Sequence, residues 1–153
     1  MKNNKLFILI SLLIALFLPA ISFSAGLPAS VEQLIKNAKL TIKTVNMIEF
    51  KAIYDKHDVG LLIDVRDPDE YAAGHIPGAV NISRGTIEFK IWNRVGGTDK
   101  PDYNKKMMLY CGSGSRCVLA TKSLVELGFT NATGIDMKLA EWVKAGNPIE
   151  ASQ

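Results

Sequence analysis

MMLYCGSGSRCVLATKSLVELG (residues 107–128) joins an apolar run to an amphipathic segment through a glycine-rich turn. The run at 107–111 predicts a buried strand, and the apolar side chains of 116–128 lie mainly on one side of a helix that ends at a glycine. Gly112 and Gly114 permit a positive φ or a close backbone approach in the turn. A strand, a short loop and a helix in this order are typical of an α/β domain.

The rest of the chain continues this alternation. Short apolar runs predict further strands at 60–65, 78–82 and 131–135, and helical spacing of apolar residues predicts helices at 30–40, 47–58, 67–74, 84–95 and 138–148. The pattern indicates an α/β domain with a mostly parallel sheet covered by helices on both faces. Ligands bind such sheets at the carboxyl ends of the strands, which is where the glycine-rich turn lies.

The N-terminal stretch MKNNKLFILISLLIALFLPAISFSAG (1–26) has the layout of a secretory signal peptide. Lys2 and Lys5 precede an apolar run from Leu6 to Leu18, and proline and small residues follow. The run is shorter than the roughly 20 residues that a bilayer span needs. We therefore expect a signal peptide at 1–24, a domain at 25–153, and a periplasmic or secreted protein.

Size and charge narrow the function further. Removal of residues 1–24 leaves 129 residues, enough for one domain with its own core. It also takes away two lysines and no acids, which lowers the net charge from +3 to +1. This charge and the absence of a basic run in the sequence give no support for a nucleic-acid partner.

The two cysteines, Cys111 and Cys117, are six positions apart. An exported protein meets an oxidising environment, but a disulfide between them would close only a small loop and would stabilise little of the fold. Placed at the tip of a strand, Cys111 would instead face the N–H groups of the loop and the positive end of the following helix dipole. That environment favours a thiolate nucleophile, and Arg116 adds a permanent positive charge for an anionic substrate or partner.

Other interpretations of the loop remain open at this point. The loop lacks the lysine and the spacing of a nucleotide phosphate loop, and two cysteines with the distant His57 and His75 do not make a metal ligand set, so no metal is expected. An ordinary turn with a buried cysteine is the plainest alternative. Cys117, which is next to Val118, is predicted to be a small core residue rather than a second active thiol.

Two separated segments resemble the signatures of rhodanese-like domains. LLIDVRDPDEYAAGHIPGAVNI (61–82) is similar to the first signature, and YCGSGSRC (110–117) is similar to the active loop, in which a cysteine, four residues and an arginine follow one another. EWVKAGNPIE (141–150) is similar to the usual ending of the family. The resemblance covers nearly the whole of 25–153 and implies a rhodanese-like fold, with a parallel sheet of about five strands and helices on both faces.

The resemblance implies sulfurtransferase chemistry without a cofactor. Cys111 would attack the outer sulfur of a small anionic donor such as thiosulfate, release sulfite and carry the sulfur as a persulfide to a thiol or cyanide acceptor. The substrate-binding residues would be those of the loop: Gly112, Ser113, Gly114, Ser115 and Arg116. A periplasmic thiol reductant or a sulfur-relay protein is the further partner expected.

Loop length distinguishes members of the wider family. Related phosphatases and arsenate reductases have five residues between cysteine and arginine, whereas this chain has the four residues GSGS (112–115), which go with sulfur transfer. The start of the loop is similar to that of mercaptopyruvate-type enzymes and the closing Arg116 to that of thiosulfate-type enzymes. Thiosulfate is the donor that we expect. An exported thiol-redox protein that uses both cysteines, and a non-catalytic module that binds an anion or a partner, are the alternatives.

Four polar residues of the first signature are interpreted as supporting residues rather than reacting groups. Asp64 or Glu70 is expected to pair with Arg116, Arg66 to pair with Glu70, and His75 to be a structural histidine. The sequence departs from the family pattern before Trp142, where Met137 and Lys138 replace the usual pair of glycines. Since that turn often lies near the active loop, the departure bears on donor access and specificity.

Overall fold

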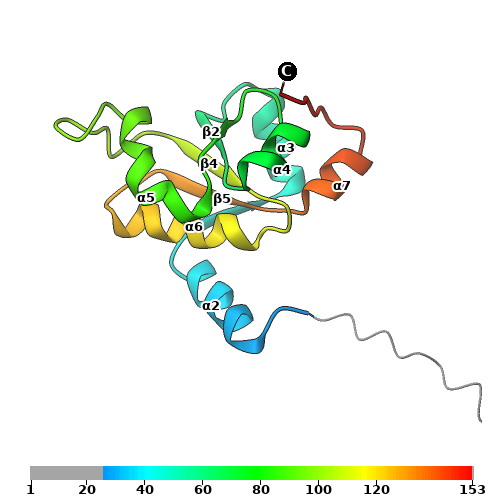
Figure 1. The fold of residues 1–153 in the computed structure, drawn as a ribbon, viewed down its shortest axis with the longest axis horizontal. Coiled ribbons are helices and arrows are strands. Elements are labelled where there is room, and N and C mark those ends of the chain that lie inside the picture. Colours follow the sequence, from blue (N-terminus) through cyan, green and yellow to red (C-terminus); the bar gives the residue numbers. More distant parts are fainter. Residues whose placement is uncertain (1–25, 153) are drawn as a thin grey trace, which may run out of the picture.

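The computed structural model describes residues 26–152, in which five parallel strands form a single sheet with helices on both faces (Figure 1). The strand order across the sheet is β1 (Lys43–Asn46), β5 (Ala132–Asp136), β4 (Met107–Tyr110), β2 (Leu61–Asp64) and β3 (Val80–Asn81). The helices are α2 (Ala29–Lys39), α3 (Met47–Asp55), α4 (Pro68–Ala73), α5 (Ile87–Lys90), α6 (Ser115–Glu126) and α7 (Leu139–Lys144). The predicted α/β fold is confirmed, while the predicted signal peptide at 1–24 lies outside the described residues.

The central strand β4 explains why helices cover both faces. All four of its residues are buried, and successive side chains of a strand point to opposite faces. Met107 and Leu109 therefore pack in the core beneath α5 and α6, while Met108 and Tyr110 pack in the core that contains Trp142 of α7. A strand that is apolar throughout is typical of a sheet buried on both sides.

The segment 84–95 was expected to form one helix, but it divides into three short ones. A 3-10 turn at Arg84–Thr86 leads into α5, and a second 3-10 turn covers Ile91–Arg94. The indole N–H of Trp92 donates to the carbonyl oxygen of Glu88 at 2.9 Å, which is the oxygen that a continuing α-helix would offer to the backbone of Trp92. The side chain thus takes the place of a helical hydrogen bond.

The edge strand β1 was not predicted from the sequence. It pairs in parallel with β5, and only one of its four residues, Val45, is even half-buried. Its residues therefore show no apolar run. Its partner lies some ninety positions further along the chain, beyond the reach of local patterns.

The helix α2 lies outside the two helix layers and contacts α6 (Figure 1). Its buried residue is Ala38, and Lys39 at its last position forms an ion pair with Asp136 at the end of β5, with 2.5 Å between Nζ and Oδ2. This ion pair connects α2 to the carboxyl end of the sheet. Within residues 26–152, no helix has the length and apolar character needed to cross a membrane.

Candidate active site

Cys111 directly follows β4 at the carboxyl end of the sheet, and its side chain has no exposed surface. Residues 112–114 form the loop, and α6 begins at Ser115, one residue earlier than predicted. Because β4 lies between β5 and β2, the segments that follow those two strands flank Cys111 on either side. The strand order alone therefore brings three separate parts of the chain to this cysteine.

The loop surrounds the Cys111 sulfur with hydrogen-bond donors. The neighbouring Cys117 thiol and the backbone N–H groups of Cys117, Ser113 and Gly114 favour the charged form of this sulfur. The Cys117 thiol contributes most and the N–H groups add to it, so they outweigh the opposing effect of burial and lower the pKa of Cys111 to about 6. Cys111 is therefore largely a thiolate at neutral pH, which is the nucleophilic form of cysteine.

Cys117 is buried beneath Cys111, in the same core cluster. Its sulfur lies 3.1 Å from the carbonyl oxygen of Gly114 and 3.3 Å from that of Ile135. The neighbouring Cys111 and burial raise the pKa of Cys117, so this thiol keeps its proton. Both cysteines are free, and the protonated Cys117, which donates to these carbonyl oxygens, is not a second nucleophile.

Gly114 is the loop residue whose conformation requires glycine. Its φ is +86°, in the left-handed region, and a Cβ there would lie 3.0 Å from Oδ1 of Asp136. Gly112 has no positive φ, and the nearest atom to a Cβ at that position would be Nη2 of Arg116 at 3.6 Å, an ordinary contact. Of the two glycines that the sequence singled out, only Gly114 is needed for the turn itself.

Arg116, the second residue of α6, forms a bidentate ion pair with Glu70 of α4. The distances are 2.6 Å from Nη1 to Oε2 and 2.8 Å from Nη2 to Oε1, and Asp67 lies 3.5 Å from Nη1. Hydrogen bonding to Arg116 lowers the pKa of Glu70 to about 2, against the effect of burial. Of the two acids expected to pair with Arg116, Glu70 is the one that does so.

Asp64 pairs with Arg66 instead. The Arg66 Nη2 atom lies 2.6 Å from Asp64 Oδ2 and also donates to the carbonyl oxygen of Gly74 at 2.6 Å. The expected pair of Arg66 with Glu70 is therefore wrong, because Arg66 turns back onto the end of its own strand. This buried ion pair holds the segment after β2 against the start of the turn that follows α4.

His75 is buried and contacts the C-terminal segment at Glu150. Its ring stacks on Tyr71 with 3.7 Å between ring centroids, and Nδ1 lies 3.0 Å from the Tyr71 carbonyl oxygen. Nε2 lies 3.3 Å from Oε1 of Glu150, and the backbones of the two residues exchange hydrogen bonds of 2.8 and 2.9 Å. Its ring nitrogens contact these groups and not the loop.

The turn between β5 and α7 lies directly against the active loop. The backbone N–H of Leu139 donates to the Gly112 carbonyl oxygen at 2.9 Å, and a Cβ on Gly114 would meet the backbone of Met137 at 3.4 Å. Met137 is buried and Lys138 is exposed, and neither has a positive φ. The turn without the glycine pair is thus built from ordinary backbone conformations, and it lies near the active loop, as the family resemblance implied.

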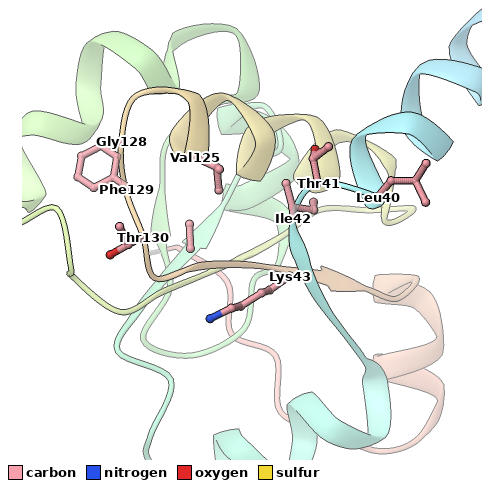
Figure 2. Close-up of a pocket in the computed structure, with 9 residues that line it drawn as sticks. Leu40, Thr41, Ile42, Lys43, Val125, Gly128, Phe129 and Thr130 are labelled. Atoms are coloured by element: carbon pink, nitrogen blue, oxygen red, sulfur yellow. The ribbon is translucent and has the colours of Figure 1, made fainter.

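Two pockets differ in their relation to this loop. A cavity of about 440 Å³ lies between the C-terminal end of α6 and the start of β1, where Leu40, Val125 and Phe129 are among its lining residues (Figure 2). It is at the amino ends of the strands, away from Cys111. A second pocket, of about 350 Å³, lies between α2 and Ser115, the first residue of α6. Within residues 26–152, no cluster of three or more side chains suited to metal binding occurs.

The comparisons with known proteins agree with this geometry. Residues 47–145 match the family described as the rhodanese-like domain. The thiosulfate:glutathione sulfurtransferase of Saccharomyces cerevisiae is 31% identical over 115 residues, which are 69% of this chain and 81% of that protein. The thiosulfate sulfurtransferase GlpE of Pseudomonas entomophila is 31% identical over 113 residues, 70% of this chain and 96% of its own length.

Among solved structures, a Rhodopseudomonas palustris protein of unknown function, described as a possible tyrosine phosphatase, superposes with a TM-score of 0.68 and 26% identity. That superposition covers 82% of this chain and 98% of the other. A human single-domain sulfurtransferase superposes with a TM-score of 0.56 and 28% identity, covering 66% of this chain and 95% of the other. With the strand order, the loop between β4 and α6 and the matched residues in agreement, the chain belongs to the rhodanese-like family.

Proposed function

We propose that this protein is a sulfurtransferase that carries a sulfane sulfur on Cys111 from a small anionic donor such as thiosulfate to a thiol or cyanide. The observation that carries the proposal is the position of Cys111 between the end of β4 and the start of α6, where the Cys117 thiol and three backbone N–H groups lower the pKa of its thiol. The names of the relatives, two of them thiosulfate sulfurtransferases, support the same reaction class.

The proposed reaction has two half-reactions. The Cys111 thiolate attacks the outer sulfur of thiosulfate, the sulfur–sulfur bond of the donor breaks, and sulfite leaves with the electron pair. The acceptor then attacks the outer sulfur of the persulfide, and the electron pair returns to Cys111. Both states of the cysteine are anionic, so the same N–H groups stabilise both of them.

The burial of Cys111 favours small reactants. Since its side chain has no exposed surface, every reactant has to open the loop to reach the sulfur, and a small anion needs a smaller opening than a phosphorylated side chain. The four residues between Cys111 and Arg116 also make a narrower loop than the five-residue form of phosphatases. Arg116 is already paired with Glu70, so in this proposal it orients the loop, while the N–H groups hold the donor.

The test is sulfite release from thiosulfate by the parent and by a Cys111→Ser variant. We expect the parent to release sulfite and to gain the mass of one sulfur atom, and the variant to do neither. Equal activity in the variant would overturn the proposal. A protein that binds thiosulfate but never gains sulfur would instead support a non-catalytic binding module.

The likeness to a possible tyrosine phosphatase gives the competing function a direct test. Hydrolysis of p-nitrophenyl phosphate by the parent, lost in Cys111→Ser, would support phosphatase chemistry.

A thiol-redox role is tested by the mass of the protein under non-reducing conditions. A loss of two hydrogens would indicate a disulfide between Cys111 and Cys117, whereas a single sulfur adduct would argue against it.

We also propose that the protein is exported, because the sequence at 1–24 has the layout of a signal peptide. Fractionation of the producing cells and N-terminal sequencing of the protein test this. A periplasmic or secreted protein that begins near residue 25 is expected, and a protein that keeps its first residues in the cytoplasm would contradict it. An exported enzyme needs a thiol reductant or a sulfur-relay protein there as its partner.

A further inference from the structure

The pocket between α2 and the active loop has no role in the chemistry described so far. We call it the α2 pocket, and its lining residues are Leu27, Glu32, Ile35, Lys36, Lys39 and Ser115. All but Ser115 belong to α2 or the segment before it. Since α2 precedes residues 47–145, membership of the family does not account for this pocket.

The α2 pocket adjoins the reactive sulfur through the loop itself. Ser115 lines the α2 pocket and is the first residue of α6, directly after the loop 112–114 that follows Cys111. A second connection runs through Asp136, which pairs with Lys39 and lies against Gly114. A molecule bound in the α2 pocket is therefore beside the loop that presents the sulfur.

The charges of the α2 pocket indicate the kind of molecule that it suits. Lys39 is already paired with Asp136, whereas Lys36 is exposed and has no carboxylate in salt-bridge contact among residues 26–152. Glu32 adds one carboxylate, and Leu27 and Ile35 add apolar surface. Since Asp136 neutralises Lys39, the α2 pocket offers the ammonium group of Lys36, the carboxylate of Glu32 and an apolar wall, and these suit an organic zwitterion.

The size of the α2 pocket suits the sulfur acceptor better than the sulfur donor. At about 350 Å³ it falls in the range of small-molecule sites and is far larger than an inorganic sulfur anion requires. The donor needs only the N–H groups of the loop. The acceptor, by contrast, needs a place for its organic part while its sulfur meets the outer sulfur of the persulfide.

We propose that the α2 pocket binds the acceptor of the sulfur, a small thiol of amino-acid or peptide type that carries carboxylate groups. The inference rests on the proposed function, since it assigns a site to the second half-reaction. The acceptor thiolate attacks the outer sulfur of the Cys111 persulfide and forms a new sulfur–sulfur bond. The bond to Cys111 breaks, its electron pair stays on Cys111 as a thiolate, and the acceptor leaves as a persulfide anion.

The first test compares acceptors in the full-length protein after loading with thiosulfate. In Lys36→Glu, we expect the KM for glutathione, which has two carboxylates and one ammonium group, to rise about 3- to 10-fold. The KM for 2-mercaptoethanol, which has no charge, and the rate with cyanide should stay at the parent's values. The matched control is Lys43→Glu, which changes an exposed lysine at the other pocket and should leave all three acceptors unaffected.

Equal effects of Lys36→Glu on the KM for glutathione and for 2-mercaptoethanol, or no effect on either KM, would overturn the proposal. An effect of Lys43→Glu as large as that of Lys36→Glu would also overturn it.

The second test uses S-methylglutathione, which binds but cannot accept sulfur. We expect it to shift the amide resonances of α2 and Ser115, and more weakly in Lys36→Glu. If the parent forms no persulfide, the proposed function fails, and this binding measurement decides the α2 pocket by itself. The absence of any shift would overturn the proposal.

Discussion

At the scale of single residues, Cys111 has a property that can be measured without any substrate. Its pKa lies near 6 because the Cys117 thiol and the loop N–H groups stabilise the thiolate. Only the thiolate reacts with iodoacetamide, so the alkylation rate should rise through a midpoint near pH 6 and level off above it. In Cys117→Ala the largest contribution is removed, and the midpoint should move upward. A midpoint close to 9 in the parent would contradict the described environment of the sulfur.

Glu70 predicts a second pH effect, on the stability of the fold, which like the reactivity of Cys111 requires the deprotonated side chain. Its pKa is lowered from 4.5 to about 2 in the folded protein, so its pairing with Arg116 stabilises the fold above about pH 4.5 and is lost as pH falls toward 2. The side chains are 36% and 37% exposed, so solvent screens the pair and its contribution is at most about 1 kcal/mol.

The measurement for Glu70 is urea unfolding of the parent and Glu70→Gln at several pH values. The difference in the free energy of unfolding should be present at pH 7 and disappear at low pH. A difference as large at pH 2 as at pH 7 would show that the variant acts through packing and not through charge.

Residue-scale features differed in how far the sequence could predict them. The place of Cys111 and its loop between a strand and a helix followed from residue types, because the loop is a continuous segment. The partners of Arg116 and Arg66 were ambiguous, since several acids lie within a few positions of one another and only the fold chooses among them. The closeness of Asp136 to Gly114 had no signal, because it depends on β5 lying beside β4.

At the scale of elements, the loop between β4 and α6 depends on one left-handed residue. Gly114→Ala should destabilise the protein by about 1–3 kcal/mol, because a side chain is strained at φ +86° and approaches Asp136. It should also reduce sulfite release, since the Gly114 N–H holds the sulfur. Gly112→Ala is the matched control and should change the free energy of unfolding by less than about 0.5 kcal/mol.

Thermal unfolding and the sulfite assay on the two glycine variants check this prediction. Equal destabilisation by both substitutions would mean that the loop tolerates no side chain at all, and the particular conformation of Gly114 would then not be the cause.

Element boundaries show where local patterns stop being informative. The strand β4 was predicted because a strand buried on both faces is apolar throughout. The helix α6 was predicted because burial of one side places apolar residues at helical spacing. The division of 84–95 into three short helices follows from a side-chain hydrogen bond of Trp92, which no spacing of apolar residues reveals. The edge strand β1 is mostly exposed, so it carries the pattern of a polar loop.

At the scale of the whole molecule, the two ends of the sheet have different characters. The carboxyl ends of the strands gather Cys111, the pair of Arg116 with Glu70 and the α2 pocket, and the amino ends carry the cavity of Figure 2. The proposed chemistry therefore belongs to one end of the sheet. Variants at the amino end, such as Lys43→Glu, serve as controls for that reason.

The edges of the sheet have a consequence for anyone who shortens this protein. On one side the sheet ends with β3, which is only two residues long, and on the other with β1, which covers β5. A fragment trimmed to the family match at 47–145 would lose β1 and leave the backbone N–H and C=O groups of β5 unpaired along the sheet edge. Such an edge recruits strands from other molecules. We expect this fragment to aggregate, and light scattering should show large particles where the chain from residue 26 onward stays dispersed.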